Sequence, residues 1–288
     1  MLKFLREGEN KLAPCALLLG GFDGLHLGHR LLLEEAKKTG LPVGITSIAG
    51  GKGSSLFTAE EREIIFARAG IDFVCEIEFS DEVKSTSAED FLRDLFAFVP
   101  ARAVFCGEDF RFGKDALGTP ELLKKLVPCA VNVVKIAERD GKKVSISACK
   151  ELLSRGEIHE LNELLGEPYF VQGEVEHGRR VGRTYGFPTL NLTLPEEKLA
   201  PKEGVYGGYA ETPKGRYPTI VNVGARPTFG VAEKKIEAYL DGFSGDLYGA
   251  SVSIYMTEFY RGITKFSSAE ELKHQLEKDI GRLRGNEL

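Results

Sequence analysis

The stretch Gly20-Gly21-Phe22-Asp23-Gly24-Leu25-His26-Leu27-Gly28-His29-Arg30 decides how the first half of the chain folds. The apolar residues 16–19 before it are typical of a buried parallel strand, and residues 31–38 after it have helical spacing. The stretch is therefore predicted to be a strand-to-helix turn at the edge of an α/β sheet. Glycines let a ligand approach the backbone there, and the N-terminus of the following helix favours a phosphate group.

Two histidines of this turn are candidate catalytic residues. His26 and His29 lie three residues apart, so on the first turn of the helix they would share one face. Imidazoles there can donate hydrogen bonds to phosphate oxygens that gain charge during a transfer reaction. A glycine turn with two solvent-exposed histidines is the alternative. Because two of only five histidines fall in one glycine-rich turn, we favour phosphate chemistry.

Composition indicates a globular protein that is large enough for one large domain or two ordinary ones. The chain has 288 residues, of which 42% are hydrophobic and 28% are charged. The net charge of −5 argues against a general binder of nucleic acid or of anionic membranes. The cysteines are Cys15, Cys75, Cys106, Cys129 and Cys149. They lack metal-ligand or redox spacing, and with no signal peptide or membrane-spanning run we expect a cytoplasmic protein with reduced thiols.

Strands and helices alternate through the first half. The strands are predicted at residues 16–19, 43–48, 73–77, 103–106 and 131–136. Thr58 and Glu61 form a capping box, Ser87 caps another helix, and Thr119 precedes a proline at the first position of a third. The alternation predicts a doubly wound, Rossmann-like and mostly parallel sheet. The glycine-rich residues 50–55 lack the P-loop pattern and are predicted to be a flexible loop.

A second candidate loop, Gly107-Glu108-Asp109-Phe110-Arg111-Phe112-Gly113, follows the fourth predicted strand. Open α/β sheets bind ligands at the carboxyl ends of their strands. Two aromatic rings and an arginine could hold a flat ligand and its phosphate. An ordinary loop with Phe110 and Phe112 in the core explains the same residues, and spacing does not separate the two interpretations.

The pattern changes in the second half. Residues 151–154 and 157–165 are predicted to be short helices, and Gly166-Glu167-Pro168 then interrupts the chain. We therefore expect a first domain at 1–150, a helical linker at 151–167 and a second domain at 168–288. Short strands such as 219–223 and 236–240, separated by turn residues, predict a closed antiparallel β-barrel. Ser268 begins an amphipathic terminal helix that is expected to pack on the barrel.

Three strings of the second half could carry chemistry. Thr189 and Asn191 end the string Gly182-Arg183-Thr184-Tyr185-Gly186-Phe187-Pro188-Thr189-Leu190-Asn191 and share one face of a strand. A hydroxyl and an amide oxygen suit a Mg²⁺ ion that also holds phosphates. Residues 222–229 form a Gly/Pro loop with a cation, Arg226. If the neighbours of Glu237 face the core, its carboxylate is simply solvated. If the face that carries Glu237 binds a ligand, it is a candidate base. From the sequence alone we favour the solvated carboxylate.

The first half resembles the nucleotidyltransferases that transfer AMP from ATP to a phosphate. Its Gly-Phe-Asp-Gly-Leu-His-Leu-Gly-His string is similar to that of the bacterial bifunctional riboflavin kinase/FAD synthetases, and residues 107–113 match their second signature. Two strings depart from the family pattern. Residues 46–51 lack the histidine of Thr-Phe-x-Pro-His-Pro. Residues 145–150 stand in place of a phosphate-binding Ser-Ser-Thr-x-x-Arg string. Ser147 replaces the threonine and Lys150 replaces the arginine; lysine keeps the positive charge but lacks the bidentate fork of arginine.

The second half, from about residue 173 to 279, resembles a flavokinase domain, because Gly-Phe-Pro-Thr-x-Asn, Asn-Val-Gly-x-Arg-Pro-Thr-Phe and Glu237 match in order. The resemblance implies that Thr189 and Asn191 hold Mg-ATP and that Glu237 is the base for the 5′-hydroxyl of riboflavin. One departure is Ile263, where the family often has an acidic residue.

The two resemblances together imply the remaining binding residues. The expected ATP and phosphate contacts are Gly21, Phe22, Asp23, Ser147, Lys150, Gly182, Pro188, Thr189 and Asn191. The expected flavin contacts are Asp109, Phe110, Arg111, Phe112, Asn222, Arg226 and Arg261. His26, His29 and Glu237 are the expected catalytic residues.

The implied function is phosphorylation of riboflavin by ATP to FMN, followed by adenylylation of FMN to FAD. Mg²⁺ is the implied cofactor, and the expected protein is a monomer or weak homo-oligomer that binds neither nucleic acid nor membrane. One alternative is a riboflavin kinase whose nucleotidyltransferase domain has weakened. Others are a non-catalytic flavin-binding regulator and a CTP-using enzyme with an unrelated barrel.

Overall fold

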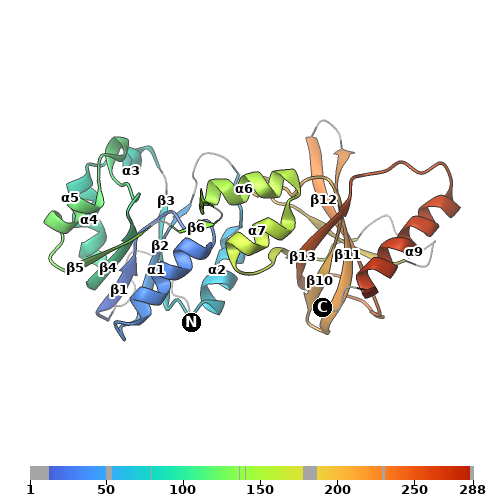
Figure 1. The fold of residues 1–288 in the computed structure, drawn as a ribbon, viewed down its shortest axis with the longest axis horizontal. Coiled ribbons are helices and arrows are strands. Elements are labelled where there is room, and N and C mark those ends of the chain that lie inside the picture. Colours follow the sequence, from blue (N-terminus) through green and yellow to red (C-terminus); the bar gives the residue numbers. More distant parts are fainter. Residues whose placement is uncertain are drawn as a thin grey trace. The chain divides into compact units, whose positions relative to one another are not determined.

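The chain forms two compact units that divide between Ala148 and Cys149 (Figure 1). The computed structural model describes residues 13–49, 54–78, 80–135, 137–139, 141–177, 187–228 and 231–285. The glycine-rich loop predicted at 50–55 lies largely outside these residues. None of the helices in the described part of the chain is both long and apolar enough to cross a membrane.

The first unit is built on a five-stranded parallel sheet, as the sequence predicted. Its strands are β1 (Cys15–Leu18), β2 (Val43–Ala49), β3 (Phe73–Glu78), β4 (Ala101–Gly107) and β5 (Ala130–Val134). Their order is β3-β2-β1-β4-β5, and every neighbouring pair is parallel. The chain therefore builds outward from β1 in one direction and then returns to add β4 on its other side. Ligands of doubly wound sheets bind where this reversal leaves a crevice, between β1 and β4.

Helices connect the strands, and most begin at the predicted caps. They are α1 (Leu27–Lys37), α2 (Ala59–Arg68), α3 (Asp81–Ser85), α4 (Ala88–Phe98) and α5 (Pro120–Leu126), with a 3₁₀ turn η1 (Lys114–Ala116) and a small hairpin of β6 (Glu138–Arg139) and β7 (Lys142–Lys143). Thr58 and Glu61 make the predicted reciprocal capping box, and Ser87 and Thr119 cap α4 and α5. The short helix α3 was not predicted.

Apolar side chains fill both faces of this sheet. One face packs Leu17, Val104 and Cys106 against Leu92 of α4 and Leu123 of α5. Successive residues of a strand point to opposite faces, so the buried Ala16 and Leu18 face the other side. All five cysteines are free, and four of them are buried. Burial raises the pKa of the Cys15 and Cys106 thiols to about 11, so these two are poorly reactive core groups.

The second unit is built on a six-stranded antiparallel sheet. Its strands are β8 (Tyr169–Glu174), β9 (Thr189–Thr193), β10 (Gly204–Thr212), β11 (Gly215–Thr228), β12 (Val231–Leu240) and β13 (Ser251–Arg261). The order is β8-β13-β10-β11-β12-β9. An isolated bridge between Glu176, two residues beyond β8, and Asn191 of β9, with an N···O distance of 2.9 Å, links the two ends of this order, so the sheet forms an antiparallel half-barrel with one contact across its opening. Strands β10, β11 and β12 are longer than the short strands that the sequence predicted.

Two helices precede the barrel. The sequence predicted a helix at 151–154, but α6 (Ile146–Arg155) begins five residues earlier, because the Ser145 hydroxyl accepts from the Ala148 amide and caps it. The second helix, α7 (Ile158–Leu165), packs on β13, where the Asn162 amide group donates to the Met256 carbonyl at 2.9 Å. Both helices, from Cys149 onward, group with the second unit. The separate linker at 151–167 remains a prediction.

The terminal helix α9 (Ala269–Gly285) packs on one face of the barrel, as predicted. Its Ile280 and Leu283 contact Val205 of β10 and Ile220 of β11. The predicted Ser268 cap is present. Three arginine–carboxylate pairs also hold the helix: Arg261 with Asp279, Arg282 with Glu258 and Arg284 with Asp241.

We expect Gly208→Ala to destabilise the barrel by about 3 kcal/mol or more. A Cβ atom at Gly208 would lie 1.9 Å from the Tyr255 carbonyl oxygen, which is backbone that cannot rotate away. Gly224→Ala is the matched control, because nothing lies within 4 Å of its added Cβ. Urea unfolding of both variants measures the difference, and equal stabilities would contradict the close approach of β10 and β13.

Candidate functional site

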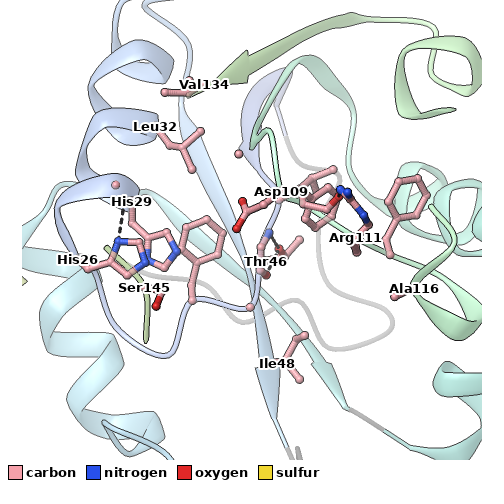
Figure 2. A pocket seen from close by; sticks show the side chains of 18 of the residues that line it. His26, His29, Leu32, Thr46, Ile48, Asp109, Arg111, Ala116, Val134 and Ser145 are labelled. Carbon is pink, nitrogen blue, oxygen red and sulfur yellow. Dashed lines mark hydrogen bonds between the residues drawn. The ribbon is translucent and has the colours of Figure 1, made fainter. Parts of the chain in front are cut away.

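A cavity of about 740 Å³ opens at the carboxyl edge of the parallel sheet, at the reversal between β1 and β4. The segments that line it include the glycine turn after β1, the loop after β4 and described residues between the end of β5 and Ser145. Figure 2 shows His26, His29 and Ser145 on one side of this space and Arg111 on the other, with Asp109 between them. Both candidate loops of the first half thus meet at one site.

The glycine turn is held in a conformation that few residues can adopt. Gly24 has a φ of 101°, and a Cβ atom there would lie 2.6 Å from the Phe57 ring. Phe22, which is almost fully buried, has a φ of 29°, in a region that is costly for any residue with a side chain. Strain of this kind persists only where the surroundings enforce it, and it concentrates at functional sites.

The two histidines interact directly with each other. His26 is the N-cap of α1, and its Nδ1 atom accepts a hydrogen bond from the His29 amide at 3.3 Å. The two rings stack with their centroids 3.6 Å apart. A Cβ atom at position 28 would lie 3.1 Å from the His26 ring, so glycine allows the ring to fold over the first turn of the helix. The two side chains lie together, as the sequence predicted, but His26 precedes the helix as its N-cap and does not lie within its first turn.

The hydrogen bonds assign a proton position to each ring. Because Nδ1 of His26 accepts, the neutral ring carries its proton on Nε2, which is then a hydrogen-bond donor. The His29 Nδ1 atom lies 3.1 Å from the Gly24 carbonyl oxygen, which can only accept, so this nitrogen carries the proton. The Nε2 atom of a neutral His29 is therefore an acceptor and becomes a donor only when the ring is protonated.

Burial keeps both rings neutral. His26 is only 7% exposed, and desolvation lowers its pKa to about 4. Desolvation is also the main reason that the pKa of His29 lies well below 6.5, and the neighbouring His26 ring lowers it further. A bound phosphate would oppose both effects, because an anion favours the protonated imidazole.

The loop after β4 combines the two interpretations that spacing left open. Phe112 is buried in the core of the sheet, and Phe110 stacks on it with ring centroids 5.4 Å apart. Phe110, Phe112, Asp109 and Arg111 nevertheless all line the cavity. Arg111 donates to the Phe110 carbonyl, and Asp109 pairs with Lys143 of β7. The aromatic residues therefore belong to the core on one side and to the cavity wall on the other.

Several residues at the cavity were not among the predicted contacts. Lys84, Lys135 and Lys143 bring positive charge to it, and Ser145 lines it from the cap of α6. Thr46 lines it as well, and its hydroxyl bonds to both the amide and the carbonyl of Gly20, at 3.1 and 2.9 Å. The sequence signal for Ser145 was its place at the start of the 145–150 string that corresponds to the family's phosphate-binding string. The sequence did not indicate the three lysines as cavity residues, because they lie far apart in the chain and belong to no motif.

Three predicted phosphate contacts do not line the cavity. Ser147 is exposed on α6, and Lys150 is half-buried one turn further on. The Asp23 carboxylate instead accepts from the amides of Leu56 and Phe57, at 2.8 and 3.1 Å. The Asp23 carboxylate thus links the glycine turn to the segment before α2. Gly21 and Phe22, by contrast, do line the cavity.

A second candidate site is a row of polar residues across three strands of the barrel. Asn191 of β9 pairs with Glu237 of β12, and Glu237 pairs with Asn222 of β11. Directly paired residues share a face of the sheet. The neighbours of Glu237, Ile236 and Ala238, are fully buried on the opposite face. Glu237 is therefore half-buried in a polar row rather than isolated in solvent.

Asn191 carries an unsatisfied polar atom in this row. The side chain is only 6% exposed, and its Oδ1 atom has no hydrogen-bond partner within the described part of the chain. A buried amide oxygen without a partner is costly, so it marks a position where a ligand or ion is expected. Thr189 lies on the same face two residues earlier, as predicted.

The other predicted contacts of the second unit vary in their surroundings. Arg261 donates to Asp279 of α9 at 2.7 and 3.2 Å, so its guanidinium holds the terminal helix. Pro188 is exposed just before β9. Arg226 lies in β11, but its side chain is outside the described residues, as is the whole of Gly182. These assignments stay predictions.

We expect His26 to make the first unit less stable as pH falls. The unfolded chain binds a proton at this residue near pH 6.5 and the folded chain only near pH 4, so protonation favours unfolding within this window. One pKa unit corresponds to about 1.4 kcal/mol, so the loss is on the order of 3 kcal/mol. Urea unfolding of the wild type across this window, compared with His26→Asn, which keeps a capping oxygen, measures it. Parallel stability curves for the two proteins would contradict the buried neutral ring.

Comparisons with known proteins find a match for each half of the chain. A family model described as FAD synthetase matches residues 8–149, and one described as riboflavin kinase matches residues 165–286. The bifunctional riboflavin kinase/FMN adenylyltransferase of Escherichia coli (strain K12) is 31% identical over 286 residues, which cover 92% of this chain and 90% of that protein. The protein of the same name from Bacillus subtilis (strain 168) is 33% identical over 294 residues, covering 94% and 92%.

A crystal structure described as a macrolide-efflux protein from Streptococcus pneumoniae has a TM-score of 0.89 and 29% identity, and it covers 98% of this chain and 97% of its own. The resemblance indicated by the sequence motifs is confirmed: the chain belongs to the family of bifunctional riboflavin kinase/FMN adenylyltransferases.

Proposed function

We propose that this chain phosphorylates riboflavin with ATP to give FMN and then transfers AMP from a second ATP to FMN, giving FAD. The family to which the chain belongs supports both reactions. The observation that carries the proposal in this chain is that each unit holds one polar constellation suited to one of them. The first unit has paired histidines at a cation-lined cavity, and the second has a carboxylate between two amides.

The kinase reaction requires a proton acceptor, because the riboflavin hydroxyl is a weak nucleophile. Glu237 is our candidate for this base, since it is half-buried between Asn191 and Asn222. As the hydroxyl oxygen bonds to the γ-phosphorus, its proton passes to the Glu237 carboxylate and ADP leaves with the electrons of the broken P–O bond. Next to Asn222 on the same face lies the apolar Val205 of β10, which packs with Ile280 and Leu283 of α9, so the terminal helix borders the polar row.

Mg²⁺ fits the chemistry of this face. The unsatisfied Oδ1 atom of Asn191 and the hydroxyl of Thr189 are our candidates to hold the ion, because both are the hard oxygen donors that Mg²⁺ prefers. When bound, the ion would neutralise charge on the phosphates of ATP. Glu237 remains free of this task in the proposal and acts on the hydroxyl.

The adenylyltransferase reaction needs no base, because the phosphate of FMN is already an anion. One of its oxygens attacks the α-phosphorus of ATP, and pyrophosphate leaves. The Nε2–H group of His26 can donate to the phosphate oxygens that gain charge. Lys84 and Lys143 line the same cavity, and each is paired with a carboxylate, Asp81 and Asp109 respectively; they are our candidates for contacts to the phosphates in place of the arginine fork that Lys150 lacks. This distribution favours a working transferase over the alternative in which this unit has weakened.

The free and mostly buried cysteines fit a reducing compartment, and we propose that both reactions take place in the cytoplasm.

The two activities should separate by mutation. With riboflavin, ATP and Mg²⁺, we expect the wild type to form FAD, and Glu237→Gln to lower FMN formation at least about 100-fold while still converting added FMN to FAD. The His26→Ala/His29→Ala variant should accumulate FMN, because only the first unit is affected. Chromatography of the flavins measures all three. A wild type that stops at FMN would refute the transferase half, and one that leaves riboflavin unchanged would refute the kinase.

Asn191→Leu should stabilise the barrel and abolish the kinase. Leucine has nearly the same shape but removes a buried oxygen without a partner, so we expect a gain of about 1 kcal/mol in urea unfolding. Phosphorylation of riboflavin should fall at the same time, because a proposed ligand of Mg²⁺ is lost. A variant that loses stability would contradict the unsatisfied oxygen, and one that keeps full kinase activity would contradict its functional use.

A further inference from the structure

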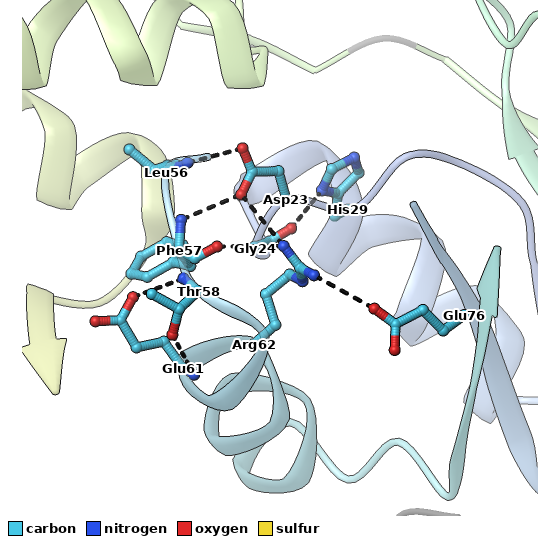
Figure 3. Close-up of polar contacts among 9 residues, drawn as sticks. All are labelled: Asp23, Gly24, His29, Leu56, Phe57, Thr58, Glu61, Arg62 and Glu76. Carbon is cyan, nitrogen blue, oxygen red and sulfur yellow. Dashed lines mark hydrogen bonds and ion pairs between the residues drawn. The ribbon is translucent and has the colours of Figure 1, made fainter. Parts of the chain in front are cut away.

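A buried ionic network lies beneath the histidine turn, outside the cavity itself. Arg62 of α2 is only 7% exposed, and its guanidinium lies 4.0 Å from an Asp23 carboxylate oxygen and 3.8 Å from one of Glu76 on β3. It also donates to the Phe57 carbonyl at 3.2 Å. Figure 3 shows these contacts converging on the segment before α2. Neither Arg62 nor Asp23 lines the cavity.

Asp23 ties this segment to the turn that carries the histidines. Its two carboxylate oxygens accept from the consecutive amides of Leu56 and Phe57, at 2.8 and 3.1 Å. Arg62 holds the same peptide from the other side through the Phe57 carbonyl. The Asp23 carboxylate therefore binds the Phe57 amide and the Arg62 guanidinium binds the Phe57 carbonyl, and the two charged groups also face each other.

The position of Phe57 in turn constrains Gly24. The Phe57 ring is 2% exposed, and it occupies the space where a Cβ atom of Gly24 would lie. The Gly24 carbonyl is the acceptor for the Nδ1–H group of His29, at 3.1 Å. Displacing Phe57 would release Gly24 from its left-handed conformation and move that carbonyl. The contacts thus run without interruption from Arg62 and Asp23 to the ring of His29.

We propose that Asp23 and Arg62 are positioning residues for the adenylyltransferase reaction: through Phe57 and Gly24 they hold His29 with its proton on Nδ1 and its Nε2 free. The inference rests on the proposed function of this unit. It reassigns Asp23, which sequence comparison suggested as a phosphate contact. A carboxylate that already accepts two amides and faces an arginine organises the site better than it could bind an anion.

The cost of the network supports this role. Burying an arginine with carboxylates stabilises a fold little, and apolar residues of similar volume usually do as well or better. Such a network does, however, fix one arrangement of the backbone. Preorganised contacts behind a catalytic group determine its orientation and tautomer, and small displacements of that group are costly for the reaction.

Asp23→Asn tests the proposal, because asparagine keeps the shape but replaces one acceptor oxygen with an NH₂ group. We expect kcat for FAD formation from FMN to fall about 10- to 100-fold, with KM for ATP changing less than about threefold. Riboflavin phosphorylation by the same molecules is the internal control, because its residues lie in the other unit. Side-chain nitrogen NMR follows the tautomer of His29, which a spectrum of His29→Ala identifies among the five histidines.

Asp72→Asn is the matched control. The Asp72 carboxylate also accepts from a backbone amide, that of Val43 at 2.7 Å, but its partner lies at the start of β2, away from the cavity. This variant should keep both the wild-type kcat and the His29 tautomer even if its melting temperature falls. If Asp23→Asn does not fold, Arg62→Lys replaces it, because lysine keeps the charge but loses the fork that reaches both Phe57 and Glu76.

Loss of the Nδ1–H signature together with lower kcat in Asp23→Asn or Arg62→Lys, but not in Asp72→Asn, would support the proposal. A folded variant that keeps the wild-type tautomer and kcat would overturn it, as would a tautomer change that leaves kcat unaltered. Failure of the proposed function is a different result, because the wild type itself would then form no FAD.

Discussion

The hydrogen bond from the His29 amide to the His26 ring is the interaction on which the first site depends. It begins α1, and in doing so it places the capping side chain over the first turn of the helix. Because the ring nitrogen must accept, the opposite nitrogen of His26 becomes a donor facing the cavity. Every other feature of the turn serves this geometry: Gly28 leaves room for the ring, and Gly24 holds the second histidine. The His26 side chain therefore both caps α1 and carries a ring N–H that is available as a donor.

Strand register has the same importance in the second site. Asn191, Glu237 and Asn222 become neighbours only because β9, β12 and β11 pair in one alignment. Shifting a strand by one residue would turn its polar member to the apolar interior. The bridge between Glu176 and Asn191 that links the two ends of the sheet lies in the same row, so this link and site formation depend on the same residues. The unsatisfied oxygen of Asn191 is a cost that the half-barrel tolerates at this position.

The two sites use different physics for related chemistry. In the first, neutral imidazoles and lysines line a cavity, a setting that would suit the already charged nucleophile of the proposed transfer. In the second, a carboxylate stands between amides, which suits a hydroxyl that must lose a proton. Two of the departures from the family strings bear on the first site: Ser147 and Lys150 do not line the cavity, whereas Lys84, Lys143 and Ser145 do. Charge in this cavity thus comes both from Asp109 and Arg111 of the second family signature and from lysines outside the family strings.

Local signals in the sequence were sufficient for the elements and for the histidine pair. The caps at Thr58, Ser87, Thr119 and Ser268 depend on residues within one helical turn, and all four are present. The stacking of His26 on His29 likewise follows from a spacing of three residues. Contacts between distant segments could not be derived this way: Lys143 meets Asp109 across 34 positions, and Arg261 of β13 meets Asp279 of α9 across 18. The sequence by itself determined which short segments fold and which residue types can act. Only the tertiary structure decided that Asp23 supports the turn and that Glu237 stands in a polar row, because strand pairing and packing, not spacing, bring those groups together.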